Sequence, residues 1–179
     1  MRIYGAQRAP YWEADGKIVC TITRAASTSI NQSMTSARRR EEGSNPRSID
    51  AAKARKAEGA EVHAWVREPL DRLASAFLYF GRRDPSWFAQ YVLANMNIHW
   101  QPQIEQLTLD GSLFPTHLHR FENLNSEWSN VFPSVPLGKA RVSFERQSWA
   151  DIRDQMTPAE VAGIIAKYAA DTAFYEAIS

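Results

Sequence analysis

Residues 17–42 consist of three parts in sequence: a short apolar run, a stretch of small polar residues, and a segment with apolar residues at helical spacing. The run from Lys17 to Ile22 is rich in β-branched residues and follows a turn signal at Asp15-Gly16, which indicates a buried strand. Residues 23–29 read Thr-Arg-Ala-Ala-Ser-Thr-Ser and lead into apolar positions at helical spacing that extend to about Glu42. The segment therefore predicts a strand, a tight loop and a helix, in that order.

The same alternation recurs along the chain. Glu61–Val66 and residues 114–121 are expected to be strands, whereas residues 43–47 and 97–103 are expected to be loops. Cap signals predict further helices that start near Ser48 or Asp50, at Pro69, after Asp84, near Glu122 and after Thr157. This order predicts one α/β domain over residues 1–179, with a short central parallel sheet flanked by helices and a core of about residues 17–175.

Composition excludes several classes of protein. With 44% hydrophobic and 23% charged residues, the chain is neither disordered nor collagen-like. It has no apolar run of about 18 residues and no signal-peptide pattern, so we expect a cytoplasmic protein without a membrane partner. Cys20 is the single cysteine, and no Cys/His cluster accompanies it, so the sequence predicts no metal site.

Charge is unevenly distributed. Residues 1–90 contain 15 Lys/Arg and 10 Asp/Glu, whereas residues 91–179 contain 6 and 10. A basic first half suits an anionic ligand. Nucleic acid is not an expected partner, because the pI of about 7.9 lies below the usual value for basic nucleic-acid-binding domains.

The loop after the first strand has the composition of an anion cradle. Backbone N–H groups at a helix N-terminus favour negative charge, and Ala25, Ala26 and Ser27 let an anion approach the backbone closely. Thr28 and Ser29 add hydroxyl donors, and Arg24 adds a positive charge. The Walker A pattern is absent, which disfavours an ordinary P-loop kinase. The alternative interpretation is a capped helix with a solvated Arg24.

A second motif follows the second strand. Residues 67–77 read Arg-Glu-Pro-Leu-Asp-Arg-Leu-Ala-Ser-Ala-Phe. Arg67 stands at the carboxyl end of that strand, where open α/β sheets bind their ligands, and its planar guanidinium suits a phosphate. Arg72 lies three residues before Ser75 and is expected on the same side of the helix.

These two stretches resemble the sulfotransferases that use 3′-phosphoadenosine 5′-phosphosulfate (PAPS). That family has a 5′-phosphosulfate loop, typically Pro-Lys-x-x-x-Thr-Ser, and a 3′-phosphate motif, typically Arg-Asp-Pro-x-x-Arg-x-x-Ser-Ala-Tyr. Residues 22–29 look like the first and residues 67–77 like the second. The resemblance implies a P-loop-like fold in which Arg67 and Ser75 bind the 3′-phosphate. It also implies a 5′-end site made by Arg24, Ala25, Ala26, Ser27, Thr28 and Ser29.

A third stretch narrows the resemblance. Residues 99–103, His-Trp-Gln-Pro-Gln, look like an element of carbohydrate sulfotransferases of the chondroitin 4-O type, and residues 120–124 look like their Tyr-Glu-x-Leu segment. Arg24 departs from the family's lysine, and Thr23 from its proline. The chain also lacks the membrane anchor of the Golgi enzymes, so it resembles a short bacterial or phage-like form.

The resemblance implies a specific reaction, and two other functions remain as alternatives. It implies sulfuryl transfer from PAPS to a hydroxyl, expected on a glycan, with 3′-phosphoadenosine 5′-phosphate (PAP) as product and no metal. Arg24 would stabilise the leaving phosphate, and His99 is the first candidate for the base, with Asp50 and Glu68 as substitutes. The alternatives are a non-catalytic PAP- or PAPS-binding module and an atypical small-molecule kinase. Trp87 and Trp100 are kept as candidates for the acceptor site.

Two further observations concern the other basic and imidazole side chains. Arg38, Arg39 and Arg40 end the first helix, where a basic run usually forms a solvated face. His117 and His119 alternate along an expected strand and so share a face, but two residues do not make a metal site. His63 is expected to be a structural residue of its strand.

Overall fold

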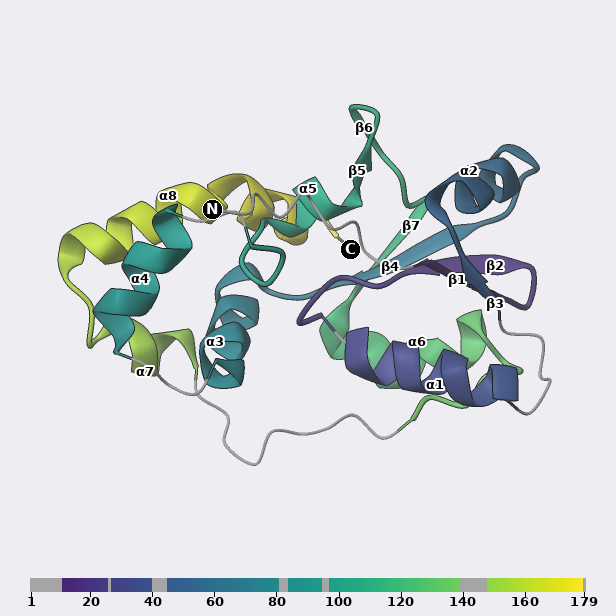
Figure 1. Cartoon of the computed structure of the whole chain (residues 1–179), viewed down its shortest axis with the longest axis horizontal. Coiled ribbons are helices and arrows are strands. Elements are labelled where there is room, and N and C mark those ends of the chain that lie inside the picture. Colours follow the sequence, from purple (N-terminus) through teal and green to yellow (C-terminus); the bar gives the residue numbers. More distant parts are fainter. Residues whose placement is uncertain are drawn as a thin grey trace.

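A computed structural model describes residues 11–25, 27–39, 45–80, 84–94, 97–138 and 148–178. Its centre is a five-stranded sheet with the strand order β3-β1-β2-β4-β7 (Figure 1). The strands are β1 Tyr11–Ala14, β2 Lys17–Cys20, β3 Asn45–Arg47, β4 Val62–Val66 and β7 His117–Arg120. A separate two-stranded hairpin joins β5 Thr108–Leu109 to β6 Ser112–Leu113.

The sheet is mixed rather than wholly parallel. Strands β2, β4 and β7 run parallel, as the alternation of strands and helices predicts, but β1 runs antiparallel to both β2 and β3. Asp15 (φ 51°) and Gly16 (φ 73°) form the two-residue turn between β1 and β2. Positive φ at both positions is the geometry that an Asp-Gly pair favours in a tight hairpin. The Asp15-Gly16 turn thus joins β1 to β2, and the sequence analysis predicts only β2.

The prediction of a loop over residues 43–47 is wrong for its second half. Asn45–Arg47 forms β3, which pairs with β1 at the edge of the sheet. Pro46 lies opposite Trp12 in this pair. Proline lacks a backbone N–H and is tolerated in a strand chiefly at such an edge, so its presence masks a strand in the sequence.

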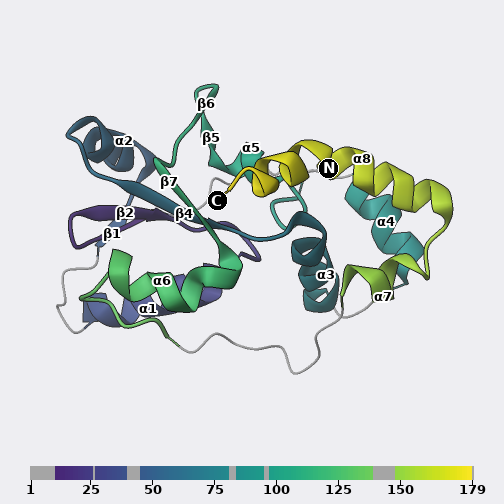
Figure 2. The same ribbon diagram turned by 180° about the vertical axis from the view of Figure 1, so that it is seen from behind.

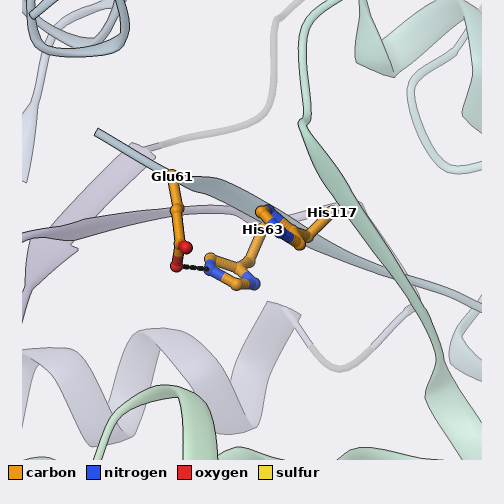
Figure 3. A group of neighbouring side chains, drawn as sticks. All are labelled: Glu61, His63 and His117. Atoms are coloured by element: carbon orange, nitrogen blue, oxygen red, sulfur yellow. Dashed lines mark hydrogen bonds and ion pairs between the residues drawn. The ribbon is translucent and has the colours of Figure 1, made fainter. Parts of the chain in front are cut away.

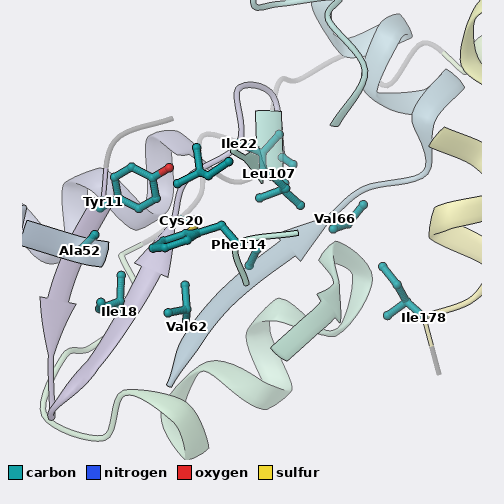
Figure 4. Packing of buried hydrophobic residues seen from close by; sticks show 13 residues of the cluster. Tyr11, Ile18, Cys20, Ile22, Ala52, Val62, Val66, Leu107, Phe114 and Ile178 are labelled. Atoms are coloured by element: carbon teal, nitrogen blue, oxygen red, sulfur yellow. The ribbon is translucent and has the colours of Figure 1, made fainter. Parts of the chain in front are cut away.

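Helices cover both faces of the sheet. The helices α1 Ser27–Arg39 and α6 Leu124–Val131 lie against one face, and α2 Ile49–Ala57 lies against the other (Figures 1 and 2). Alternation along the strands explains this arrangement, because neighbouring residues of a strand point to opposite faces. Val19 and Trp65 belong to the core cluster with α1 and α6, whereas Ile18 and Ala64 belong to the cluster with α2. Figure 4 shows the second cluster, with Ile18 of β2 and Ala52 of α2.

Four more helices gather beside the sheet and form a core of their own. They are α3 Pro69–Tyr79, α4 Pro85–Ala94, α7 Trp149–Arg153 and α8 Pro158–Glu176. Their buried side chains pack with Trp100 in one cluster that includes no residue of the strands. Two short elements complete the fold, α5 Gln103–Leu107 and the 3₁₀ helix η1 Phe121–Asn123.

The predicted helix starts are largely confirmed. The side chain of Ser48 caps α2, and the predicted capping box of Thr157 and Glu160 forms at α8. Asp84 Oδ1 accepts a hydrogen bond from the Trp87 N–H at the start of α4, at 2.8 Å. Among the described residues, no helix combines the length and the apolarity that crossing a bilayer requires.

Candidate functional site

Arg24 stands in a sharp turn at the carboxyl end of β2. The Ala25 N–H donates a hydrogen bond of 3.1 Å to the Ile22 carbonyl, and Arg24 adopts φ 67°. Left-handed backbone is uncommon for a residue with a side chain and clusters at functional sites. The turn therefore holds this arginine in a conformation that needs support from its surroundings.

That support comes from α3. Arg24 Nη2 donates hydrogen bonds to Ser75 Oγ at 2.7 Å and to the Ser75 carbonyl at 2.8 Å. Its guanidinium carbon lies 4.8 Å from the centre of the Tyr79 ring, and Tyr79 follows Ser75 by one helical turn. The His99 ring stacks on Tyr79 with centroids 5.2 Å apart. Arg24, Ser75, Tyr79 and His99 thus form one continuous group.

Arg67 follows β4, next to β2 in the sheet, and its backbone is clamped. Gln103 Oε1 accepts a hydrogen bond from the Arg67 N–H at 3.0 Å, and Gln103 Nε2 donates to the Arg67 carbonyl at 2.7 Å. Gln103 is itself held by Asp171 Oδ2 at 3.2 Å. The Arg67 guanidinium lies over the ring of Phe121, at 5.2 Å from its centre. A buried amide thus fixes the chain at the point where it leaves the sheet.

Arg72 lies on the side of α3 that contacts the loop after β2, as Ser75 does, but it is buried there. It is 1% exposed and donates to three backbone carbonyls. Nη1 reaches Thr23 at 3.0 Å and His99 at 3.3 Å, and Nη2 reaches Gln101. Arg72 therefore ties the loop after β2 to the segment that carries His99.

Positive charge accumulates here. Burial lowers the pKa of Arg24, and the neighbouring Arg67 and Arg72 lower it further. Burial also lowers the pKa of His99, again with help from Arg24 and Arg72, so this imidazole is neutral at pH 7. Within the described part of the chain, neither Arg24 nor Arg72 forms an ion pair with a carboxylate. The guanidinium of Arg24 is therefore not neutralised by a directly bonded carboxylate, which suits an anion.

Buried polar atoms without a hydrogen-bond partner also occur around Arg24. Arg24 Nε, Arg72 Nε and His99 Nδ1 are buried and make no hydrogen bond within the described structure. Such atoms are rare in folded proteins, because each one costs the free energy of its lost hydration. Three of the five such side-chain atoms in the described part of the chain lie in this group, and the other two are Trp65 Nε1 and Trp100 Nε1.

The anion-binding loop predicted for residues 24–29 is formed only in part as expected. Helix α1 begins at Ser27, so Ser27, Thr28 and Ser29 make its first turn rather than a preceding loop. Ser27 is half-buried and Thr28 is exposed, whereas Ala25 and Ser29 are buried. Ala26 lies outside the described residues, as does Arg40 of the basic run. The two accessible hydroxyls are thus those of Ser27 and Thr28.

The remaining candidates are the two tryptophans considered for the acceptor site and the two substitute bases, and they lie in different parts of the structure. Trp100 is 2% exposed in the helical core, which corrects its interpretation as an acceptor-site residue, while Trp87 is 41% exposed and stacks on Tyr91. Glu68 caps α3 by accepting the Asp71 N–H, and burial raises its pKa. Asp50 is exposed in the first turn of α2.

Two residues of the site escaped sequence reasoning. Tyr79 could have been found from its position four residues after Ser75, which places both on one face of α3. Gln106 accepts a hydrogen bond from the Thr23 N–H at 3.4 Å and donates to the Ile98 and Gln101 carbonyls. Its role depends on the packing of α5 beside the loop after β2, which no local pattern signals.

Comparisons with known proteins give no assignment. No family model, no curated protein and no solved structure matches this chain. The functional interpretation therefore rests on the motifs that this sequence resembles and on the geometry of this chain.

Proposed function

We propose that this protein is a sulfotransferase that moves the sulfuryl group of PAPS to a hydroxyl of a carbohydrate acceptor, on a P-loop-like fold. One observation carries the proposal. Arg24, from the stretch that resembles the 5′-phosphosulfate loop, is bonded through Nη2 to Ser75, from the stretch that resembles the 3′-phosphate motif. Two motifs 51 residues apart thus meet at the carboxyl edge of parallel strands, where such sheets bind ligands.

The donor's two ends match two groups of side chains. Arg67 and Ser75 bind the 3′-phosphate, and the Ser75 hydroxyl can serve Arg24 and a phosphate at once. It accepts from Arg24 Nη2, and its own proton is available for a phosphate oxygen. The N–H groups and hydroxyls at the start of α1 bind the 5′ end, where the helix dipole favours negative charge.

Arg24 stabilises the reaction electrostatically. The acceptor oxygen attacks sulfur, the bond from sulfur to the 5′-phosphate oxygen breaks, and PAP leaves with the bonding electrons. The leaving phosphate is a weak base, so it requires a nearby positive charge rather than a proton. Arginine supplies that charge and stays protonated at neutral pH. Its replacement of the family's lysine is therefore compatible with turnover.

His99 accepts the proton that the acceptor hydroxyl loses. The arginines around it lower its pKa in the free protein, which keeps the ring neutral but makes it a weak base. A bound donor brings negative charge next to Arg24 and Arg67 and so offsets this effect. The histidine thus becomes a stronger base when the donor is in place.

The decisive experiment is a calorimetric titration of the protein with PAP and with ADP. The two nucleotides differ in the position of the second phosphate, so PAP should bind at least about tenfold more tightly if Arg67 and Ser75 form a 3′-phosphate site. Arg67→Ala should remove the difference, whereas the matched control Arg153→Ala, an exposed side chain on α7, should retain it. Equal affinity for both nucleotides would overturn the assignment. Preferential PAP binding without turnover of PAPS on a panel of glycans would favour a non-catalytic binding module.

A further inference from the structure

A second cluster of titratable side chains lies at the other end of β4. Glu61, His63 and His117 each offer one ligand atom, and these atoms lie within 4.8 Å of one another (Figure 3). The parallel pairing of β4 with β7 places His63 opposite His117. Arg67 follows His63 by four residues, or about 13 Å of extended strand, so this cluster is separate from the anion site.

Hydrogen bonds fix the tautomer of His63. His119 Nδ1 lies 2.7 Å from Glu127 Oε2, and because a carboxylate only accepts, this nitrogen carries the proton. His119 Nε2 is then an acceptor, and His63 Nδ1, 2.9 Å away, donates to it. His63 Nε2 is left with a lone pair. It lies 3.3 Å from Glu61 Oε2, which also has only lone pairs to offer.

His117 is oriented in the same sense. The Thr116 hydroxyl donates its single proton to the Val62 carbonyl, at 3.2 Å. Thr116 Oγ1 therefore accepts from His117 Nδ1 at 2.9 Å, and the lone pair of His117 falls on Nε2. Three potential ligand atoms thus come together, and with His119 neutral two of them face each other with no proton between them. A cation between them removes this repulsion.

We propose that Glu61, His63 and His117 bind a divalent transition-metal ion, with zinc as the best match. Two imidazole nitrogens and one carboxylate oxygen form an established zinc donor set that leaves a fourth position for water. Ligand atoms around tetrahedral zinc lie about 3.3 Å apart, given bonds of about 2.0 Å. The Glu61–His63 pair already has this spacing. Glu61 and His117 are exposed, so His117 can turn towards the pair and the ion can enter from solvent.

The surroundings of His63 resemble those of a metal ligand. A ligating histidine usually donates its second N–H to a group that fixes the ring, and here His119 and then Glu127 take that place. The sequence analysis predicts no metal site, because His63 and Glu61 come close to His117 only through the pairing of β4 and β7.

Lys17 is the competing cation. Its Nζ lies 3.2 Å from Glu61 Oε2, so a metal must displace this ammonium group from the carboxylate. Lys17→Met should therefore tighten metal binding. This variant should raise the affinity for zinc, whereas the removal of a ligand should lower it.

The test is a calorimetric titration of the tag-free 179-residue chain with Zn²⁺ after dialysis against a chelator, supported by the visible spectrum of the Co²⁺ form. We expect one equivalent of zinc and the absorption bands of tetrahedral Co²⁺. The thermal midpoint should rise by about 5–10 °C at a free zinc concentration 100-fold above Kd. His117→Ala and Glu61→Gln change exposed residues and should each weaken zinc binding by at least about tenfold. The matched control Glu58→Gln, an exposed carboxylate on the turn after α2, should bind as the wild type does.

Two results would overturn the proposal. One is a wild-type protein that binds no zinc at about 0.1 mM, which would leave a proton as the cation of the cluster. The other is binding that His117→Ala and Glu61→Gln both leave unchanged. The proposal is independent of the sulfotransferase assignment, because PAP affinity should be the same in the wild type and in His117→Ala.

Discussion

The guanidinium of Arg24 is bonded to both oxygens of Ser75, at 2.7 Å to the hydroxyl and 2.8 Å to the carbonyl. This relationship joins the loop after β2 to α3 before any ligand binds. The Ser75 carbonyl lies within α3, so its position is set by the helix rather than by a mobile side chain. Arg24 is thus positioned in advance for the charge that develops on a leaving phosphate.

Arg24→Ala should abolish most of the turnover of PAPS. Removal of a preorganised positive charge commonly lowers kcat by about 10²- to 10³-fold. Arg24→Lys should restore a large part of the rate, because lysine also supplies a positive charge. Initial rates with saturating PAPS and acceptor measure both effects. A rate for Arg24→Ala within twofold of wild type would contradict the proposed role.

Ser75→Ala should act on affinity rather than on the chemical step. The variant loses one hydrogen bond to the 3′-phosphate, and hydrogen bonds to charged groups contribute about 1.5–3 kcal/mol. We therefore expect PAP affinity to fall about 10- to 100-fold in calorimetry, while ADP affinity changes little. Equal losses for PAP and ADP would show that Ser75 instead supports the site as a whole through Arg24.

Arg72→Met should destabilise the protein. The substitution keeps much of the apolar stem but leaves the part-buried carbonyls of Thr23 and His99 without the Arg72 donor, whereas the Gln101 carbonyl keeps its bond from Gln106. Each unsatisfied buried group costs about 1–3 kcal/mol, so we expect a loss of at least about 2 kcal/mol in the free energy of unfolding. Urea denaturation measures it. Arg153→Met, an exposed arginine on α7, is the matched control and should stay within about 0.5 kcal/mol of wild type.

The pH dependence of turnover should report the charge around His99. A general base works when neutral, so the rate falls as pH drops through its pKa. Burial and the neighbouring arginines lower this pKa in the free protein. The acid limb of kcat/KM should therefore lie below pH 6.5, the ordinary value for histidine. A bound donor adds negative charge, so the acid limb of kcat should lie at higher pH than that of kcat/KM.

His99→Gln separates this effect from the titration of the donor's own phosphate. The variant should lose the acid limb that belongs to the imidazole and keep any limb that belongs to PAPS. Identical pH profiles for the variant and the wild type would exclude His99 as the base.

Local patterns predicted the elements that position the site. The strand from Lys17, the strand before Arg67 and the cap signals of Ser48, Asp84 and Thr157 all correspond to observed elements. These features depend on short-range chemistry, namely β-branched runs and side chains that accept helix N–H groups. The order of strand, turn and helix around Arg24 was visible for the same reason.

Contacts between distant segments were not predictable in this way. Nothing near Gln103 in the sequence indicates that its amide clamps Arg67, and nothing near Arg72 indicates that it turns inwards to three carbonyls. Trp100 stands beside His99 in the sequence, yet the helical core buries it while His99 reaches the site. Such outcomes depend on which face of each helix the rest of the fold covers.

The separation of the helical core from the two cores of the sheet has a consequence for local opening. Arg24 belongs to the sheet side and Ser75 to the helix side, so the site spans two packing units. Units with separate cores can open at different free energies, and their amide protons then exchange at different rates. A ligand that bridges the two units would couple their opening, so that α3 and β2 exchange as one cooperative block.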